Sequence, residues 1–199
     1  MSHRIHLSRD KKLHIIIRDQ DAFELEKKKN IHLHLCASII SQQLSTKVAA
    51  VIYARFLNLF KTKTPTAKSI LEIPFDELRA IGLSNSKTHY IRNVCAFFIH
   101  EKMTDAALHK MSNDEVMDKL IQIKGVGKWT IEMLLMFTLG CEDVFAVDDL
   151  GIQKAMTHLY KLDFDDKKKL KEDMLKISSK WSPFRTYACL YLWGWKDKK

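Results

Sequence analysis

Apolar residues recur at steps of three and four along most of the chain, which is the period of one face of an α-helix. The pattern is clearest in five stretches, at residues 33–44, 48–56, 90–98, 131–138 and 187–191. No stretch alternates apolar and polar residues for long, and the sequence has no Asn-Gly or Asp-Gly hairpin turn. Residues 15–17 and 144–147 have the composition of short strands, but neither has a visible partner strand. The pattern therefore predicts an all-α fold.

Glycines and prolines divide this helical pattern into segments. Twice a short helical stretch runs into a turn that contains glycine and is followed by a longer helix, once around Gly82 and once around Gly125. Residues 163–171 are charged throughout and are typical of a solvated helix face. The length of 199 residues fits one compact unit, or at most two small lobes.

The formal net charge is +9, so a polyanion such as nucleic acid is the first partner to consider. The four cysteines are far apart and form no C-x-x-C pair, which gives no indication of a zinc knuckle or a redox dithiol. We expect them to be reduced and buried as small apolar residues. No segment has the form of a signal peptide or the length of a membrane span, so we expect a soluble, intracellular protein with no membrane contact.

The most informative segment is residues 120–130, where an apolar helical stretch is followed by Gly125 and Gly127 and then by a second helix. Glycine permits positive φ and close approach of the backbone to another molecule. The free N–H groups at a helix N-terminus suit a phosphate. Lys128 falls in the first turn, where a cation is unfavourable unless an anion lies nearby. A plain helical connection with glycine caps is the alternative explanation.

A pair of aspartates, Asp148 and Asp149, follows about twenty residues later. Aspartate is a favoured N-cap, and one of the two can cap the next helix. A cap needs only one carboxylate, which leaves the second for another role.

The segment around Gly125 and Gly127 resembles the helix–hairpin–helix motif of DNA repair proteins. Three more segments, at residues 38–45, 79–90 and 181–193, resemble the alkylpurine branch of the helix–hairpin–helix glycosylases, the 3-methyladenine DNA glycosylase II type. The resemblance runs from about residue 33 to 195. It implies a two-lobed helical fold with a DNA cleft between the lobes. It also implies one glycosylase domain over residues 1–199, with the hairpin at about 115–139.

The resemblance also implies roles for individual residues. Asp149 is the matching catalytic position, and Asp148 is then expected to be the cap or a structural partner. The predicted base pocket consists of Trp129, Met133 and Trp193, whereas Trp181 and Trp195 are expected in the core. The residues predicted to contact DNA are Gln43, Ser45, Lys87, Gly125, Gly127, Lys128 and Thr130, with Gln43 at the position of the intercalating wedge. The carbonyls of Ile121, Ile123 and Gly125 are expected to hold Na⁺ or K⁺, and no other cofactor is required.

These residues suit the hydrolysis of the N-glycosidic bond of an alkylated purine in double-stranded DNA. A flipped base with its own positive charge can leave without an acid, so one carboxylate is enough. An aromatic pocket favours a cationic base. We expect a monomer that acts in base excision repair. The alternatives are a non-catalytic DNA-binding protein and a glycosylase with lyase activity, although lyase relatives have lysine at the position of Trp129.

Overall fold

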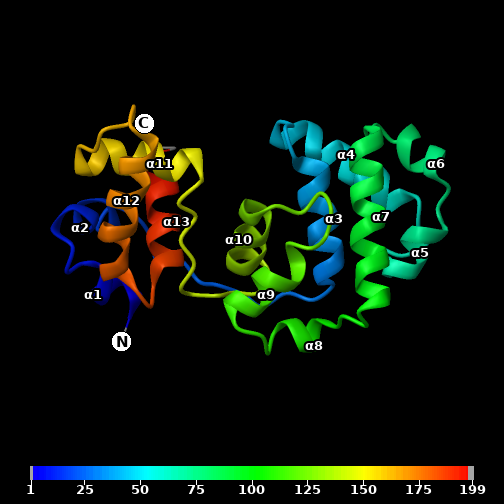
Figure 1. Ribbon diagram of the computed structural model, residues 1–199, viewed down its shortest axis with the longest axis horizontal. Coiled ribbons are helices and arrows are strands. Elements are labelled where there is room, and N and C mark those ends of the chain that lie inside the picture. Colours follow the sequence, from blue (N-terminus) through cyan, green and yellow to red (C-terminus); the bar gives the residue numbers. More distant parts are fainter. Residues whose placement is uncertain (1, 197–199) are drawn as a thin grey trace. The chain divides into compact units, whose positions relative to one another are not determined.

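The computed structural model describes residues 2–196, and the regular secondary structure of these residues is entirely helical, as the sequence predicts. The helices in chain order are α1 (His3–Leu7), α2 (Lys11–Ile17), α3 (Ile31–Ser41), α4 (Thr46–Asn58), α5 (Ala67–Glu72), α6 (Phe75–Ala80), α7 (Asn85–His100), α8 (Asp105–Leu108), α9 (Asn113–Leu120), α10 (Lys128–Phe137), α11 (Leu150–Tyr160), α12 (Lys167–Ser178), the 3₁₀ turn η1 (Ser179–Trp181) and α13 (Arg185–Lys196) (Figure 1). Within residues 2–196, none of the helices is both long and apolar enough to cross a membrane.

The chain divides into two compact units. The central unit is Lys27–Leu134, and the terminal unit joins the chain before Lys27 to the chain from Leu135 onward. Helix α10 contains the boundary, so its residues belong to both.

The core of the central unit forms where α7 packs against α3 and α5, and α3 packs against α4 (Figure 1). Ile39, Phe56, Ile91 and Val94 are fully buried there. Hydroxyl side chains begin several of these helices by accepting a hydrogen bond from an N–H of the first turn, as Ser84 does for α7. The apolar period of the sequence is thus the buried face of these helices.

In the terminal unit, α13 packs against α11 and α2. Trp181 and Tyr191 are among its largest fully buried side chains. The Gln20 amide donates to the carbonyls of Ile16 and Tyr191, both at 2.9 Å, and this ties the N-terminal segment to α13.

The two stretches with strand-like composition behave differently from each other. Residues 15–17 lie in α2, whereas residues 144–147 belong to no regular element and connect α10 to α11. Cys36, Cys95 and Cys189 are buried free thiols, as expected, and Cys141 is half-buried.

Candidate active site

Asp149 is the N-cap of α11 and lies beside Trp193 of α13, within the terminal unit. Its Oδ1 accepts the backbone N–H of Ile152 and the indole N–H of Trp193, both at 2.9 Å. The residue is half-buried. Two donors from different helices therefore fix the position of one carboxylate oxygen, and the other oxygen, Oδ2, takes no part in either bond.

Of the two roles expected for Asp148, helix cap or structural partner, the structure shows the second. The cap must be the residue directly before the first helical residue, because only there can its side chain reach the N–H groups of the first turn. That residue is Asp149, with φ −71° and ψ 123°. Asp148 is instead a structural partner, since its Oδ1 pairs with Lys171 Nζ at 2.5 Å.

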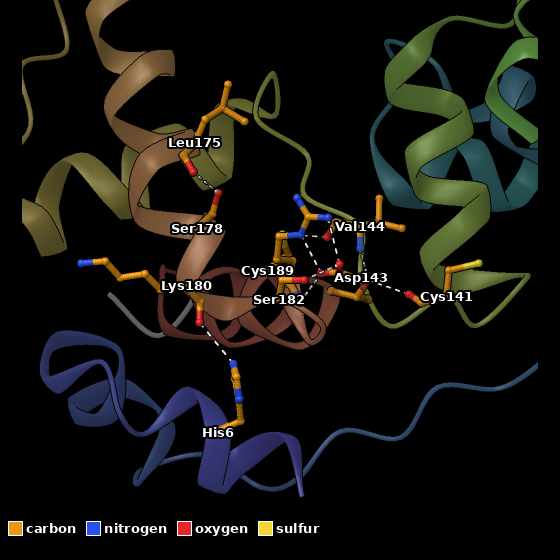
Figure 2. A network of polar contacts seen from close by, with 11 residues as sticks. His6, Cys141, Asp143, Val144, Leu175, Ser178, Lys180, Ser182 and Cys189 are labelled. Carbon is orange, nitrogen blue, oxygen red and sulfur yellow. Dashed lines mark hydrogen bonds and ion pairs between the residues drawn. The ribbon is translucent and has the colours of Figure 1, made fainter. Parts of the chain in front are cut away.

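The segment that leads to Asp149 is anchored on the start of α13 by Asp143 (Figure 2). Arg185 donates to both oxygens of Asp143, from Nε to Oδ1 at 2.6 Å and from Nη2 to Oδ2 at 2.9 Å, and Ser182 Oγ donates to Oδ2 at 2.8 Å. Burial alone would raise the pKa of the Asp143 carboxyl, but the bonds from Arg185 and Ser182 hold the pKa below its usual range. The side chain is therefore a carboxylate at neutral pH.

Thr186 adds a second set of bonds to the same segment. Its hydroxyl accepts the N–H of Val144 at 3.0 Å and donates to the carbonyl of Cys141 at 2.6 Å. These bonds hold the beginning of the segment that leads to Asp149 against the start of α13. One helix, α13, thus holds both the segment that carries Asp149 and the indole that binds it.

In the central unit, the two glycines of the predicted hairpin have different surroundings. Gly125 has φ +103°, and a Cβ added there would lie 2.1 Å from Cγ of Tyr90. A Cβ added at Gly127 would meet no atom within 4 Å. The turn is also held by Asn93, whose amide donates to the Lys124 carbonyl at 3.1 Å. Gly125 is therefore required by the fold, whereas Gly127 leaves an open approach to the start of α10.

Lys128 lies in the first turn of α10, where a cation is unfavourable, and an anion of the protein lies close to it. Its Nζ lies 3.7 Å from Oε1 of Glu132, one turn further along α10. The Lys128 side chain is 54% exposed and the Glu132 side chain only 5%. The anion that offsets the helix dipole therefore comes from the protein itself, and the lysine still reaches the surface.

Two residues predicted to contact DNA do not point outward. Thr130 is 4% exposed, because its position on α10 faces the core. Lys87 is half-buried, and its ammonium group donates to the carbonyls of Ile40 at 2.8 Å and Gln42 at 2.6 Å. In this structure the Thr130 side chain is therefore buried and the Lys87 ammonium is bound to carbonyls of the protein, and contact of either residue with DNA stays a prediction.

Gln43, the predicted wedge residue, lies with its neighbours in an exposed loop after α3. Gln43 is exposed and has φ +58°, and Leu44 beside it is 36% exposed. Ser45 is exposed and its hydroxyl caps α4, accepting the N–H of Val48 at 3.4 Å. The amide of Gln42 donates to the carbonyl of Gly125 at 3.4 Å.

The predicted base-pocket residues are distributed over α10 and α13. Trp129 is 44% exposed, and Met133 follows four residues later on the same face of α10. Trp193 is half-buried, and its ring lies 5.9 Å from that of Phe137. Phe137 is 42% exposed and was missed from the sequence, although it continues the four-residue spacing of Trp129 and Met133.

The other two tryptophans have structural surroundings. Trp181 is 1% exposed and donates its indole N–H to Asp10 at 3.1 Å, as a core residue. Trp195 is half-buried against the ring of His158.

The hairpin carbonyls are compatible with the predicted monovalent cation. The Ile123 carbonyl accepts the N–H of Val126 at 2.9 Å, and that of Gly125 accepts the Gln42 amide. A carbonyl has two lone pairs, so each keeps one for a cation. Together with Ile121 they would offer three neutral oxygens, the ligand type that a hard cation prefers. The cation site stays a prediction.

Comparison with known proteins identifies the family. The model of the HhH-GPD superfamily of base excision DNA repair proteins matches residues 36–180. The chain belongs to this superfamily. DNA-3-methyladenine glycosylase 1 of Schizosaccharomyces pombe is 36% identical over 168 residues, which cover 83% of this chain and 72% of that protein.

Two solved structures are similar to this HhH-GPD chain over nearly its whole length. The DNA-3-methyladenine glycosidase of Bacillus halodurans has a TM-score of 0.85 at 32% identity, covering 98% of this chain and 89% of the other. The S. pombe 3-methyladenine DNA glycosylase Mag1, solved in complex with abasic DNA, has a TM-score of 0.81 at 33% identity, covering 97% and 95%.

Proposed function

We propose that this protein is a monofunctional DNA glycosylase that hydrolyses the N-glycosidic bond of alkylated purines, of the 3-methyladenine and 7-methylguanine class, in base excision repair. The observation that carries the proposal is the geometry of Asp149. It is a half-buried carboxylate fixed at one oxygen by two donors, in a chain that resembles 3-methyladenine DNA glycosylases over most of its length.

The chemistry requires only one carboxylate. A purine alkylated at N3 or N7 carries a positive charge, so it leaves as a neutral base without prior protonation. The sugar then develops oxocarbenium character, and a nearby carboxylate stabilises that charge. In this proposal Asp149 is that carboxylate, and Ile152 and Trp193 hold it in position. Water completes the reaction at the sugar carbon.

The aromatic side chains would select a cationic base. Contact of a cation with an indole face contributes about 0.5–2 kcal/mol. Trp129 and Trp193 have partly exposed rings that can provide such a face. Met133 adds a polarisable, adaptable surface beside Trp129. A neutral purine lacks this attraction and is also a poorer leaving group.

DNA binding would use the hairpin and the loop after α3. Backbone N–H groups at the start of α10 offer phosphate contacts that do not depend on sequence. Gln43, exposed at the loop, would fill the gap left by the flipped nucleotide. The net charge of +9 supports binding to duplex DNA in general.

The decisive experiment is release of bases from methylated DNA, separated by chromatography, with wild type and Asp149→Asn side by side. Asparagine is as good an N-cap as aspartate, so the variant keeps the fold while it loses the charge. We expect base release to fall by about 10² to 10³.

Asp148→Asn is the matched control. It removes a carboxylate one residue away and breaks a half-exposed ion pair with Lys171, worth about 0.2–1 kcal/mol. We expect base release close to wild type. If Asp149→Asn turned over like wild type, the proposed role of Asp149 would be wrong.

A further inference from the structure

Lys87 is a half-buried cation that caps the C-terminal end of another helix. It lies on α7, and its two acceptors, the carbonyls of Ile40 and Gln42, are at the C-terminal end of α3. The last carbonyls of a helix have no partner within the helix and carry the negative end of its dipole. Burial lowers the pKa of Lys87, which agrees with an ammonium group withdrawn from solvent.

The chain that Lys87 holds has an unfavourable backbone conformation. At Gln42 it leaves α3, and Gln43 has φ +58°, a left-handed conformation that is unfavourable for a residue with a Cβ. Such a conformation persists only where the surroundings enforce it. Residues 42–45, which we call the wedge loop, present Gln43 and Leu44 to solvent. The ammonium of Lys87 donates a hydrogen bond to the carbonyl of Gln42, the first residue of this loop.

The same helix also holds the hairpin. Tyr90 lies against Gly125, and Asn93 donates to the carbonyl of Lys124. Lys87, Tyr90 and Asn93 follow one another at steps of three on α7. Gln42 closes the connection, because its side chain donates to the Gly125 carbonyl while its own carbonyl accepts Lys87.

We propose that Lys87 is a positioning residue for base flipping: it fixes the wedge loop from inside the protein, and α7 thereby sets the loop and the hairpin in one arrangement before DNA binds. The proposal deepens the proposed function and rests on it, because the loop matters only if a nucleotide is flipped. A loop fixed in advance loses less entropy when it enters the duplex.

A lysine that binds carbonyls of the protein and a lysine that contacts a phosphate affect the salt dependence of DNA affinity differently. Each lysine that neutralises a phosphate adds about one unit to the slope of log affinity against log salt. A lysine whose ammonium is bound to carbonyls of the protein adds nothing to that slope. The two roles can therefore be separated in one titration.

The test compares Lys87→Met with Arg92→Met. Arg92 is a matched control, because it also lies on α7 and caps another helix, donating to the carbonyls of Leu71 at 3.2 Å and Ile73 at 3.0 Å. Four quantities are measured for each variant: the salt slope on an abasic duplex, the fluorescence of 2-aminopurine next to the lesion, single-turnover base release, and amide hydrogen exchange of residues 42–45 without DNA.

For Lys87→Met we expect the wild-type salt slope, faster exchange in the wedge loop, less 2-aminopurine fluorescence on binding, and base release reduced about tenfold or more. For Arg92→Met we expect a loss of thermal stability, with loop exchange, flipping and release per folded molecule at wild-type values. A slope lower by about one unit with unchanged loop exchange would make Lys87 a phosphate contact and overturn the proposal.

Gln42→Met provides a second test if Lys87→Met folds poorly. It removes the link to the Gly125 carbonyl and keeps both bonds of Lys87, so loop exchange should rise and release should fall at an unchanged slope. Wild-type exchange and release in this variant would also overturn the proposal. If the wild-type protein released no alkylated purine, the proposed function would be wrong. Amide hydrogen exchange of residues 42–45 in the free protein would still test whether Lys87 fixes the wedge loop.

Discussion

The side chain of Asp149 meets a helix N-terminus and an indole at the same oxygen, and this arrangement makes the neighbouring residues sensitive to small changes. Gly151, in the first turn of α11, is one of them. A Cβ added at Gly151 would lie 3.0 Å from Oδ1 of Asp149 and 3.2 Å from Nε1 of Trp193. Contacts of that length require the neighbours to move by a few tenths of an ångström, so glycine here protects the geometry of the carboxylate.

Gly151→Ala should therefore separate stability from activity. Alanine within a helix is favoured over glycine by about 0.5–1 kcal/mol, which offsets the crowding. A displaced catalytic group, by contrast, lowers the rate steeply, by about 10² for a shift of 1 Å. We expect thermal stability within about 1 kcal/mol of wild type and single-turnover base release reduced about tenfold. Wild-type release would show that the Asp149–Trp193 pair does not need its present geometry.

Single residues also mark the limit of the sequence argument. The sequence predicted that one of the two aspartates caps the next helix and left Asp148 as either the cap or a structural partner, because a helix boundary known to within one or two residues cannot decide between neighbours. Lys87 and Thr130 were assigned to DNA by position and residue type. Whether a side chain faces solvent or a neighbouring helix depends on packing that a local pattern does not contain.

At the scale of elements, the hairpin combines a glycine that the fold requires with one that it does not. Gly125→Ala combines a positive φ with a Cβ that would overlap Tyr90, and we expect it to lower the free energy of unfolding by about 2 kcal/mol or more. Gly127→Ala adds a methyl group to open space, so the free protein should keep its stability.

Gly127→Ala should nevertheless weaken DNA binding, because its methyl group lies where the backbone is expected to approach phosphate. The loss should be the same for duplexes of different sequence, since backbone N–H groups read no base. Fluorescence anisotropy on several duplexes over a range of salt concentrations tests this. Unchanged affinity would mean that the phosphate does not approach this glycine.

The contribution of the connection between α10 and α11 to the free energy of unfolding is expected to depend on pH. The pKa of Asp143 is held below its usual range, so its ion pair with Arg185 contributes stability above the unfolded pKa of about 4, and the contribution is lost as pH falls through the lower, folded pKa. Asp143→Asn should lower the free energy of unfolding by about 1–3 kcal/mol at pH 7. Urea unfolding should show this difference shrinking toward pH 3. A difference that does not change with pH would exclude this linkage.

Elements that repeat an apolar period were predictable, and elements fixed by distant contacts were not. The stretches at 33–44, 90–98 and 131–138 lie in α3, α7 and α10 with shifts of a few residues at the ends. Residues 144–147 have strand composition, yet they lie in an irregular connection, in which Asp143 and Val144 bind the start of α13, about forty residues later. Local sequence propensity does not predict contacts between residues so far apart in the chain.

At the scale of the whole molecule, the candidate functional residues belong to two units, and the sequence resemblance implied two lobes without indicating which residues form each of them. The hairpin and the wedge loop are in the central unit, and Asp149 and Trp193 are in the terminal unit. The N-terminal segment joins the terminal unit through contacts such as that of Gln20 with Tyr191, across 171 positions. The period of apolar residues reveals each helix but not its partner, so this division was not predictable.

The protein is expected to release bases without cutting the DNA strand. A lyase needs an amine that attacks the sugar and forms a Schiff base. The position that supplies it in lyase relatives is Trp129, whose indole nitrogen is not a nucleophile. Lys128 lies about 100° around the helix, and its ammonium is paired with the buried carboxylate of Glu132 at 3.7 Å. A paired ammonium has no lone pair with which to attack.

Borohydride should therefore trap no covalent complex between the wild-type protein and damaged DNA, and the product strand should stay intact until alkali is added. Trp129→Lys is the matched positive control, because it places an amine at the lyase position of α10, where the side chain is 44% exposed. We expect this variant to give a trapped adduct on abasic DNA. An adduct of the wild-type protein that maps to Lys128 would instead assign it to the bifunctional glycosylases, since only an amine in contact with the sugar can be reduced onto it.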